Sequence, residues 1–388
     1  MKTDNCGRCV KWIVWALAAL QSSAFAVTAL APGRDDEVLE VLPAITHSRP
    51  ARNAASPLVL SRSPEAAATQ ARQDIAVARQ TGDTRYWGRA QAELAPWWGR
   101  ADAPVDMAIL QATVQQGRHE FEASRKILLA ALARSPGHAQ GWLNLAALER
   151  LSAQYDTSLK ACEAVERAGQ PLYAQACRLE TLSLQGQQAA AARGFESLLA
   201  QSANDEQRSW LLSLLAESQE RGGSDTAAAA AYVRSLALGP DLYTAIAYSD
   251  LLLRTGKTRQ ALQVLTPLPE TDAVLLRRAA AQRRLGDPGW SALRTTLRER
   301  GAELERRGDD ATLHGRELAL TSLWLDDDAA TALRVARRNL LLQREPIDWW
   351  VALQSARQAK DSAAVSEVTN AIREAGLVDV RLAARAQK

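Results

Sequence analysis

The chain has 388 residues, of which 47% are hydrophobic and only 5% aromatic, with 21 Gly and 14 Pro. This content supports a packed core and excludes a wholly disordered protein. The 47 basic and 44 acidic residues nearly cancel, so no bulk charge marks the chain as a nucleic-acid-binding or membrane-surface protein. The length alone would allow two or three domains, but helix-forming residues dominate most of it. We therefore expect an all-α protein.

The first 26 residues have the three parts of a secretory signal peptide. Basic residues precede a short apolar run over 12–20, and the small-x-small triplet Ala24-Phe25-Ala26 follows. We expect cleavage after Ala26 and export to the periplasm. The alternative is an uncleaved inner-membrane anchor that faces the periplasm, because residues 12–30 are about long enough to span a bilayer.

Residues 27–63 carry several prolines and show no helical period. This composition predicts an extended linker that leads into a repeat domain over 64–388.

From residue 64 onward the apolar spacing is helical, and the predicted helices are short and come in pairs. Small residues recur 33 to 37 positions apart, and a larger or apolar residue stands four positions after each of them. The small residue lets paired helices approach, while the larger one fills the space between neighbouring repeats. The small residues are Ser124, Ser158, Ala191, Ala228 and Ala261, and the larger ones are Leu128, Cys162, Phe195, Tyr232 and Leu265.

This pattern resembles the second half of the tetratricopeptide (TPR) repeat. The first half is best seen at 142–146, where Ala146 replaces the usual Gly, and Glu149 stands in place of the Tyr. The resemblance implies an all-α right-handed solenoid of about eight antiparallel helix pairs, clearest over 105–270. A closing helix is expected over Leu377–Ala386.

The segments 90–98 and 115–121 resemble a group of exported bacterial TPR proteins without an assigned activity, and Cys162 and Cys177 fit that group too. These cysteines are also symmetric about the turn expected at Gly169-Gln170-Pro171, so they face each other across a helical hairpin. Helix axes about 8–10 Å apart allow disulfide geometry there. In an exported chain we expect a Cys162–Cys177 disulfide in preference to buried thiols.

First-helix residues that are not used for packing line the concave groove of such an array. The repeat register selects eight of them as partner-binding residues. Their mixture of aromatic and oppositely charged side chains suits a protein or peptide better than a phosphate backbone. For Trp210 and Trp324, packing between repeats is the alternative. The eight residues are Arg150, Trp210, Glu217, Tyr243, Asp250, Arg283, His314 and Trp324.

No catalytic, cofactor-binding or metal-binding pattern emerges. None of the four histidines lies two to four residues from another His or Cys, and the Cys6–Cys9 pair has no second pair to complete a metal site. Gly256-Lys257-Thr258 lacks the earlier Gly of a phosphate-binding loop and is expected to be a turn. We therefore expect no cofactor, no metal and no enzymatic activity.

The segment 277–307 contains nine arginines, interleaved with acidic residues such as Glu299 and Glu303. This arrangement favours a solvated, salt-bridged helix surface, and an anionic partner or a membrane surface is the alternative.

Together these features predict a non-catalytic scaffold that mediates protein–protein interactions in the bacterial cell envelope. The alternatives are a membrane-anchored assembly factor that keeps its N-terminal helix and a non-catalytic helical subunit of an envelope enzyme.

Overall fold

The computed structural model of the chain describes residues 63–306 and 314–383. All of them belong to the second of two units into which the chain divides, Arg62–Lys388. The expected signal peptide, and the expected linker up to residue 62, lie outside the described residues. None of the helices within the described ranges combines the length and the apolar character needed to cross a membrane.

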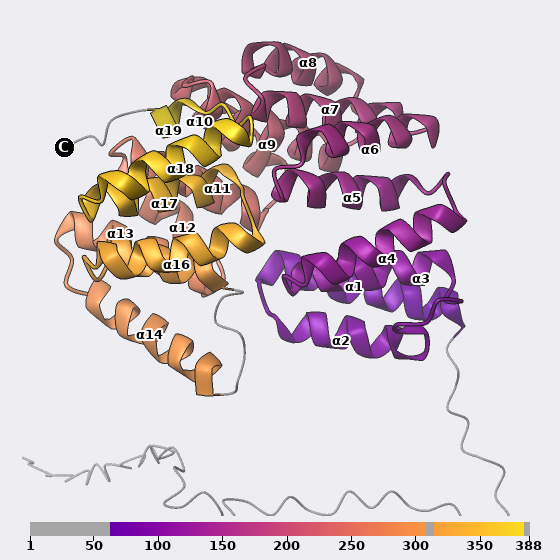
Figure 1. Ribbon diagram of the computed structural model, residues 1–388, viewed down its shortest axis with the longest axis horizontal. Helices are drawn as coiled ribbons and strands as arrows, with labels where there is room; N and C mark the ends of the chain where they lie inside the picture. The colour runs from indigo at the N-terminus through magenta and orange to yellow at the C-terminus, as the bar shows by residue number, and fades with distance from the viewer. Residues whose placement is uncertain (1–62, 307–313, 384–388) are drawn as a thin grey trace, which may run out of the picture. The chain divides into compact units, whose positions relative to one another are not determined.

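Eighteen α-helices of the described residues form nine consecutive antiparallel pairs, where the sequence predicted about eight (Figure 1). The pairs are α1 (Pro64–Thr81) with α2 (Arg85–Leu94), α3 (Val105–Gly117) with α4 (Phe121–Arg134), α5 (Ala139–Leu151) with α6 (Tyr155–Arg167), α7 (Pro171–Leu184) with α8 (Gln188–Gln201), α9 (Asp205–Arg221) with α10 (Asp225–Leu238), α11 (Leu242–Arg254) with α12 (Thr258–Leu265), α13 (Asp272–Leu285) with α14 (Trp290–Arg306), α15 (Gly315–Trp324) with α16 (Ala329–Leu342), and α17 (Pro346–Gln358) with α18 (Ser362–Glu374).

The end of the array differs from the prediction of a closing helix over Leu377–Ala386. Only Val380–Ala383 form a helix, α19, within the described residues. Before it, Leu377–Asp379 are not helical, and Val378 forms an isolated parallel β-bridge with Gln185. The backbone there pairs with a distant turn, and this pairing replaces a local helical hydrogen bond.

The repeat register is confirmed at the level of packing. Each of the five small residues and each of the five larger residues of the register is at most 1% exposed. Tyr232, Phe195, Leu128 and Leu265 are among the largest fully buried side chains. Contact of one small and one large side chain per repeat therefore sets how closely successive helices approach.

Short turns with a left-handed residue separate the two helices of a pair. Gly256 takes a φ of 75°, which confirms that Gly256-Lys257-Thr258 is a turn between α11 and α12. Ala153 takes a φ of 58° at the equivalent place between α5 and α6, although its Cβ disfavours that conformation. Helix α11 begins at its cap, Asp241, whose side chain accepts the Thr244 backbone N–H.

The array also closes on itself between helix pairs that are far apart in the sequence. The turn after α1 approaches the starts of α11 and α13, where Gly82 lies against the Thr271 and Leu242 side chains. Further along, the Arg344 backbone N–H donates to the Leu151 carbonyl over 2.7 Å. These contacts join the N-terminal pairs to the later ones.

Candidate partner-binding cavity

Where the distant pairs meet, the array contains an open cavity of about 1810 Å³. The α1–α2 and α3–α4 turns and the end of α5 form one wall, and the starts of α11, α13 and α15 together with α14 form the other. Pockets for small ligands typically measure ~300–1,000 Å³, so this cavity is large enough for a segment of polypeptide. Its lining differs from the groove that the sequence predicts, because only His314 of the eight predicted residues belongs to it.

Charged side chains of both signs line the cavity, and they are paired. The Arg300 guanidinium lies 2.8 Å from Asp272. Arg316 contacts two carboxylates, at 2.5 Å from Glu345 and 2.7 Å from Asp348. Burial lowers the pKa of Arg316, but the negative charges of Asp348 and Glu345 outweigh burial and hold this pKa well above its ordinary value. The wall therefore carries ion pairs of opposite charge and is not uniformly positive or negative.

Two histidines from distant parts of the chain meet in the cavity wall. His119 lies in the α3–α4 turn with a left-handed backbone (φ 62°), and its ring stacks on Phe121. The His119 ring centroid is 6.1 Å from that of His314, which immediately precedes α15. In the described ranges, no group of three or more His, Cys, Asp or Glu residues is arranged to hold a metal ion. Of the predicted groove residues, His314 lies in the cavity lining.

Glu217 in α9 and Tyr243 in α11 act on each other electrostatically. Burial raises the pKa of Glu217, while the charge of Arg221, 3.3 Å away, acts in the opposite direction. The Glu217 charge is the main cause that holds the pKa of Tyr243 well above its usual value. Tyr243 is 57% exposed and, like Glu217, it is not part of the cavity lining. The role of both residues in binding a partner stays a prediction.

Arg150 and Asp250 are engaged with the next repeats. The Arg150 guanidinium lies 2.7 Å from the Glu180 carboxylate, and it donates a hydrogen bond to Cys177 Sγ over 3.6 Å. Asp250 accepts two hydrogen bonds from Arg277. Both predicted groove residues thus join successive first helices. Their role in binding a partner stays a prediction.

No known protein-family model matches the chain, and no curated protein matches its sequence. Among solved structures, the chain is similar to the human IFIT1 dimer with PPP-AAAA, at 13% identity, with 84% of each chain covered and a TM-score of 0.44. It is also similar to a chain of the APC/C hetero-tetramer Cut9-Hcn1, at 13% identity, covering 81% of this chain and 76% of that one, with a TM-score of 0.39. The TPR domain of P58(IPK) is 14% identical, with 81% and 95% covered and a TM-score of 0.24.

The fold assignment rests on the molecule itself: consecutive antiparallel pairs that stack through the small and large residues of the repeat register. The chain has a TPR-like fold.

Seven of the eight predicted groove residues lie outside the cavity lining, and three of these seven pack between repeats or at turns of the TPR-like array. Trp210 packs on the core around Phe195 and against Tyr173, and Trp324 packs edge-on against Trp350. For both tryptophans the structure thus follows the alternative of packing between repeats, because a large ring fills the space between helix pairs. Arg283 lies at the turns, where it donates to the Trp324 carbonyl over 2.5 Å and to Asp327.

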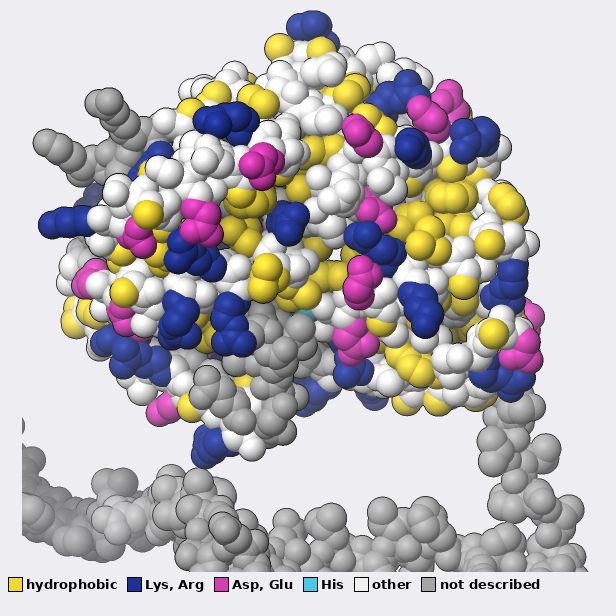
Figure 2. All heavy atoms as spheres, in the orientation of Figure 1, with side chains coloured by type: hydrophobic (Ala, Val, Ile, Leu, Met, Phe, Trp, Pro, Cys, Tyr) yellow, Lys and Arg dark blue, Asp and Glu magenta, His cyan; other side chains and the backbone are white. Residues whose placement is uncertain are grey.

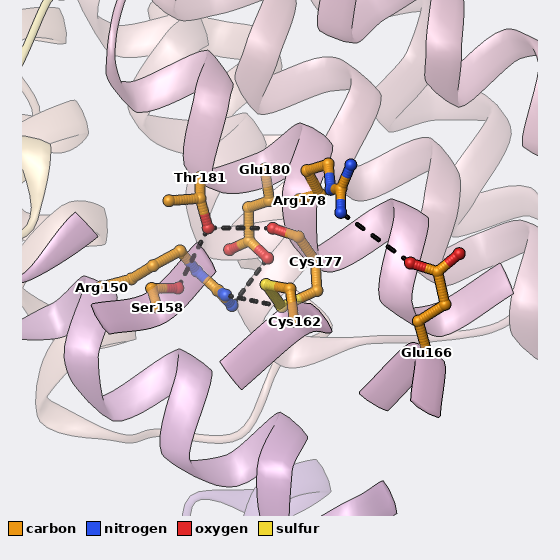
Figure 3. The surroundings of a disulfide bond; sticks show 8 residues. All are labelled: Arg150, Ser158, Cys162, Glu166, Cys177, Arg178, Glu180 and Thr181. Carbon is orange, nitrogen blue, oxygen red and sulfur yellow. Dashed lines mark hydrogen bonds and ion pairs between the residues drawn. A yellow bond between two sulfur atoms is a disulfide. The ribbon is translucent and has the colours of Figure 1, made fainter. Parts of the chain in front are cut away.

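The structure contains the predicted Cys162–Cys177 disulfide, with the two Cα atoms 5.6 Å apart (Figure 3). It joins α6, the second helix of one pair, to α7, the first helix of the next pair, and both cysteines are buried. Next to it, the Ser158 and Thr181 hydroxyls are hydrogen-bonded over 3.1 Å. The TPR-like array is therefore fastened covalently at the place where Arg150 and Glu180 pair.

The arginine-rich segment is salt-bridged, as its composition predicts, but most of its partners are not the interleaved acids. Arg294 and Arg298 both contact Asp326, from the next repeat, at 2.5 and 3.1 Å. On the face drawn in Figure 2, side chains of both charges are interspersed with hydrophobic ones. An anionic partner for this segment remains untested.

Sequence reasoning missed several residues that line the cavity, among them His119, Arg316 and Glu345. His119 carries one local signal in the sequence, since it stands five residues before Ser124, at the turn position where other repeats have Gly. Neither Arg316 nor Glu345 stands at a position of the repeat register. Glu345 lies in the loop before α17, and contacts between distant repeats bring this loop to the cavity.

Proposed function

We propose that this chain is a non-catalytic scaffold that binds a protein or peptide partner in its central cavity, and that it acts in the bacterial cell envelope. The observation that carries the proposal is the composition of the cavity wall. Paired charges of both signs alternate there with apolar side chains such as Leu148, Leu151 and Ile246. Such a mixture is typical of surfaces that bind polypeptides.

A site-specific photo-crosslinking experiment tests this function. We place a photoreactive residue at Ala147, which is exposed and lines the cavity, and as a control at Ala130, which is exposed on α4 outside its lining. The proposal predicts that Ala147 crosslinks one and the same partner in living cells, and that Ala130 does not. Equal labelling from both positions contradicts a role for the cavity.

The buried disulfide supports a location in the cell envelope, because the cytosol keeps most thiols reduced whereas the periplasm oxidises them. Export by residues 1–26 accounts for such a location. Fractionation and N-terminal sequencing test it: we expect a mature chain that begins at Val27 in the periplasmic fraction. Sequence that begins before Trp12, on protein from the membrane pellet, would establish the membrane-anchored alternative instead.

A further inference from the structure

Carboxylates outnumber basic side chains in the lining of the central cavity. Among the described residues, this lining contains eight Asp and Glu side chains, five arginines and no lysine. Each arginine lies within 3.0 Å of a different carboxylate of the same lining. The arginines are Arg85, Arg118, Arg300, Arg306 and Arg316. These pairs use up the arginine charge and leave three carboxylates over.

Two of the three remaining carboxylates lack a counter-charge. Glu270 lies 3.1 Å from Arg278, which stands outside the lining. Within the described ranges, Glu299 and Glu317 form neither an ion pair nor a side-chain hydrogen bond. Glu299 is exposed, and Glu317 is half-buried. The low-dielectric walls of a cleft focus the field of such charges into it, so this cavity attracts a cationic group.

The two uncompensated carboxylates come from neighbouring helices. Over 296–304 of α14, the lining residues recur every three or four positions, so Glu299 belongs to one continuous face of that helix. A Cβ on Gly301 of α14 would lie 3.7 Å from Leu318 of α15, the residue after Glu317. Both charges therefore belong to the same wall of the cavity.

Apolar side chains and an indole also belong to the lining. Leu151, Leu242 and Ile246 are half-buried, so each still offers apolar surface to a ligand. Trp87 is half-buried as well, and its ring lies so close to Gly117 that a Cβ there would come within 2.4 Å of it. An indole face attracts lysine and arginine cations, and the aliphatic stems of these side chains pack on apolar surface.

We propose that the partner of the central cavity is a polypeptide segment in which lysine or arginine side chains stand next to aliphatic ones. This inference rests on the proposed function and adds the chemistry of the partner. The basic side chains supply the counter-charge that Glu299 and Glu317 lack, while the aliphatic ones pack on Leu151, Leu242 and Ile246. The ion pairs already present in the wall stay intact, because the ligand brings its own positive charge.

The first test measures the binding of two short labelled peptides to the full chain by fluorescence anisotropy. The peptides share the same leucines, alanines and serines, and one carries lysines where the other carries glutamates. The lysine peptide should bind at least about tenfold more tightly, since like charges across an interface repel. Added salt should reduce this preference, because it screens exposed charges. Equal binding of the two peptides, tighter binding of the glutamate peptide or absence of binding overturns the proposal.

The second test reverses the two uncompensated charges. In the double variant Glu299→Lys with Glu317→Lys, the glutamate peptide should bind more tightly than the lysine peptide. The matched control, Glu163→Lys with Glu196→Lys, makes the same change at exposed positions of α6 and α8 outside the lining, and it should keep the original preference. Glu299→Gln with Glu317→Gln keeps the size of both side chains and should weaken binding of the lysine peptide even where the reversed chain does not fold. An unchanged preference in the glutamine variant contradicts the proposal.

Photo-crosslinking from Ala147 in living cells separates this inference from the proposed function. Glu299→Lys with Glu317→Lys should reduce the yield of the crosslinked partner at least about tenfold, whereas the control pair should not. If the reversed chain crosslinks the same partner with equal yield, the cavity binds a polypeptide but does not select a basic one, and only this inference is wrong. If Ala147 crosslinks no specific partner in any of the chains, the proposed function fails, and the inference fails with it.

Discussion

Arg277 in α13 donates two hydrogen bonds of 2.7 Å, from Nε and Nη2, to the Asp250 carboxylate in α11. The Arg277 side chain is only 4% exposed. Burial lowers the pKa of Arg277, but the Asp250 charge outweighs burial and raises it. One buried ion pair therefore connects the first helices of two successive repeats.

Removal of the acid from this pair should destabilise the array. Asp250→Ala leaves a buried guanidinium without its counter-charge, which costs about 3–5 kcal/mol in the free energy of unfolding. The double variant Asp250→Leu with Arg277→Met should recover most of this loss, since an apolar pair needs no counter-charge. Chemical denaturation measures both. An equal loss in the single and double variants contradicts this account of the pair.

The two aromatic groove candidates should behave differently. Trp210→Ala opens a cavity against the core around Phe195 and should lower the free energy of unfolding by about 3 kcal/mol. Tyr243→Ala removes a side chain that is more than half exposed, so its effect should stay below about 1 kcal/mol. Thermal and chemical denaturation compare the two. Once a partner is identified, Tyr243→Ala should weaken its binding by about 2 kcal/mol. If Trp210→Ala leaves the melting transition unchanged, the packing role of Trp210 is wrong.

The disulfide should contribute measurably to stability. It closes a loop of 15 residues, for which chain-entropy reasoning gives about 3 kcal/mol. Reduction should lower the denaturation midpoint of the unmodified chain, and it should have no effect on the double variant Cys162→Ala with Cys177→Ala. Peptide mapping by mass spectrometry under non-reducing conditions should find the two cysteines joined. Free thiols at both positions contradict the bond.

Alkaline pH should lower the stability of the fold through ionisation of the Tyr155 phenol. Burial raises the pKa of this phenol to about 12, and its hydroxyl has no hydrogen-bond partner. An unfolded chain ionises tyrosine near pH ~10, so the contribution of Tyr155 is complete below that pH and is lost as pH rises toward 12. The loss amounts to about 3 kcal/mol for a shift of this size.

The matched variant is Tyr155→Phe, which keeps the ring and removes the titrating group. Urea denaturation at several pH values gives the free energy of unfolding of both chains. The difference between the two chains should be constant below pH ~10 and should change only between pH ~10 and 12. A pH-independent difference across that range argues against a raised pKa for Tyr155.

The repeats could be predicted from local spacing alone. Ala228 and Tyr232, four residues apart, mark one repeat, because such spacing acts within a turn or two of the chain. The same local register placed Cys162 opposite Cys177, since a hairpin fixes the relative height of its own two helices. The strongest repeats were therefore the easiest to predict.

The contacts between distant repeats could not be predicted in this way. Each repeat rotates slightly relative to its neighbour, and the rotations accumulate over many repeats before distant turns meet. The contacts of His119 with His314, and of Val378 with the α7–α8 turn, depend on that accumulated geometry. Sequence patterns that reflect packing between neighbouring repeats carry no information about the accumulated rotation. For that reason the sequence predicted a concave groove lined by first helices, whereas the array of the structure has a cavity lined mainly by turns and by α14.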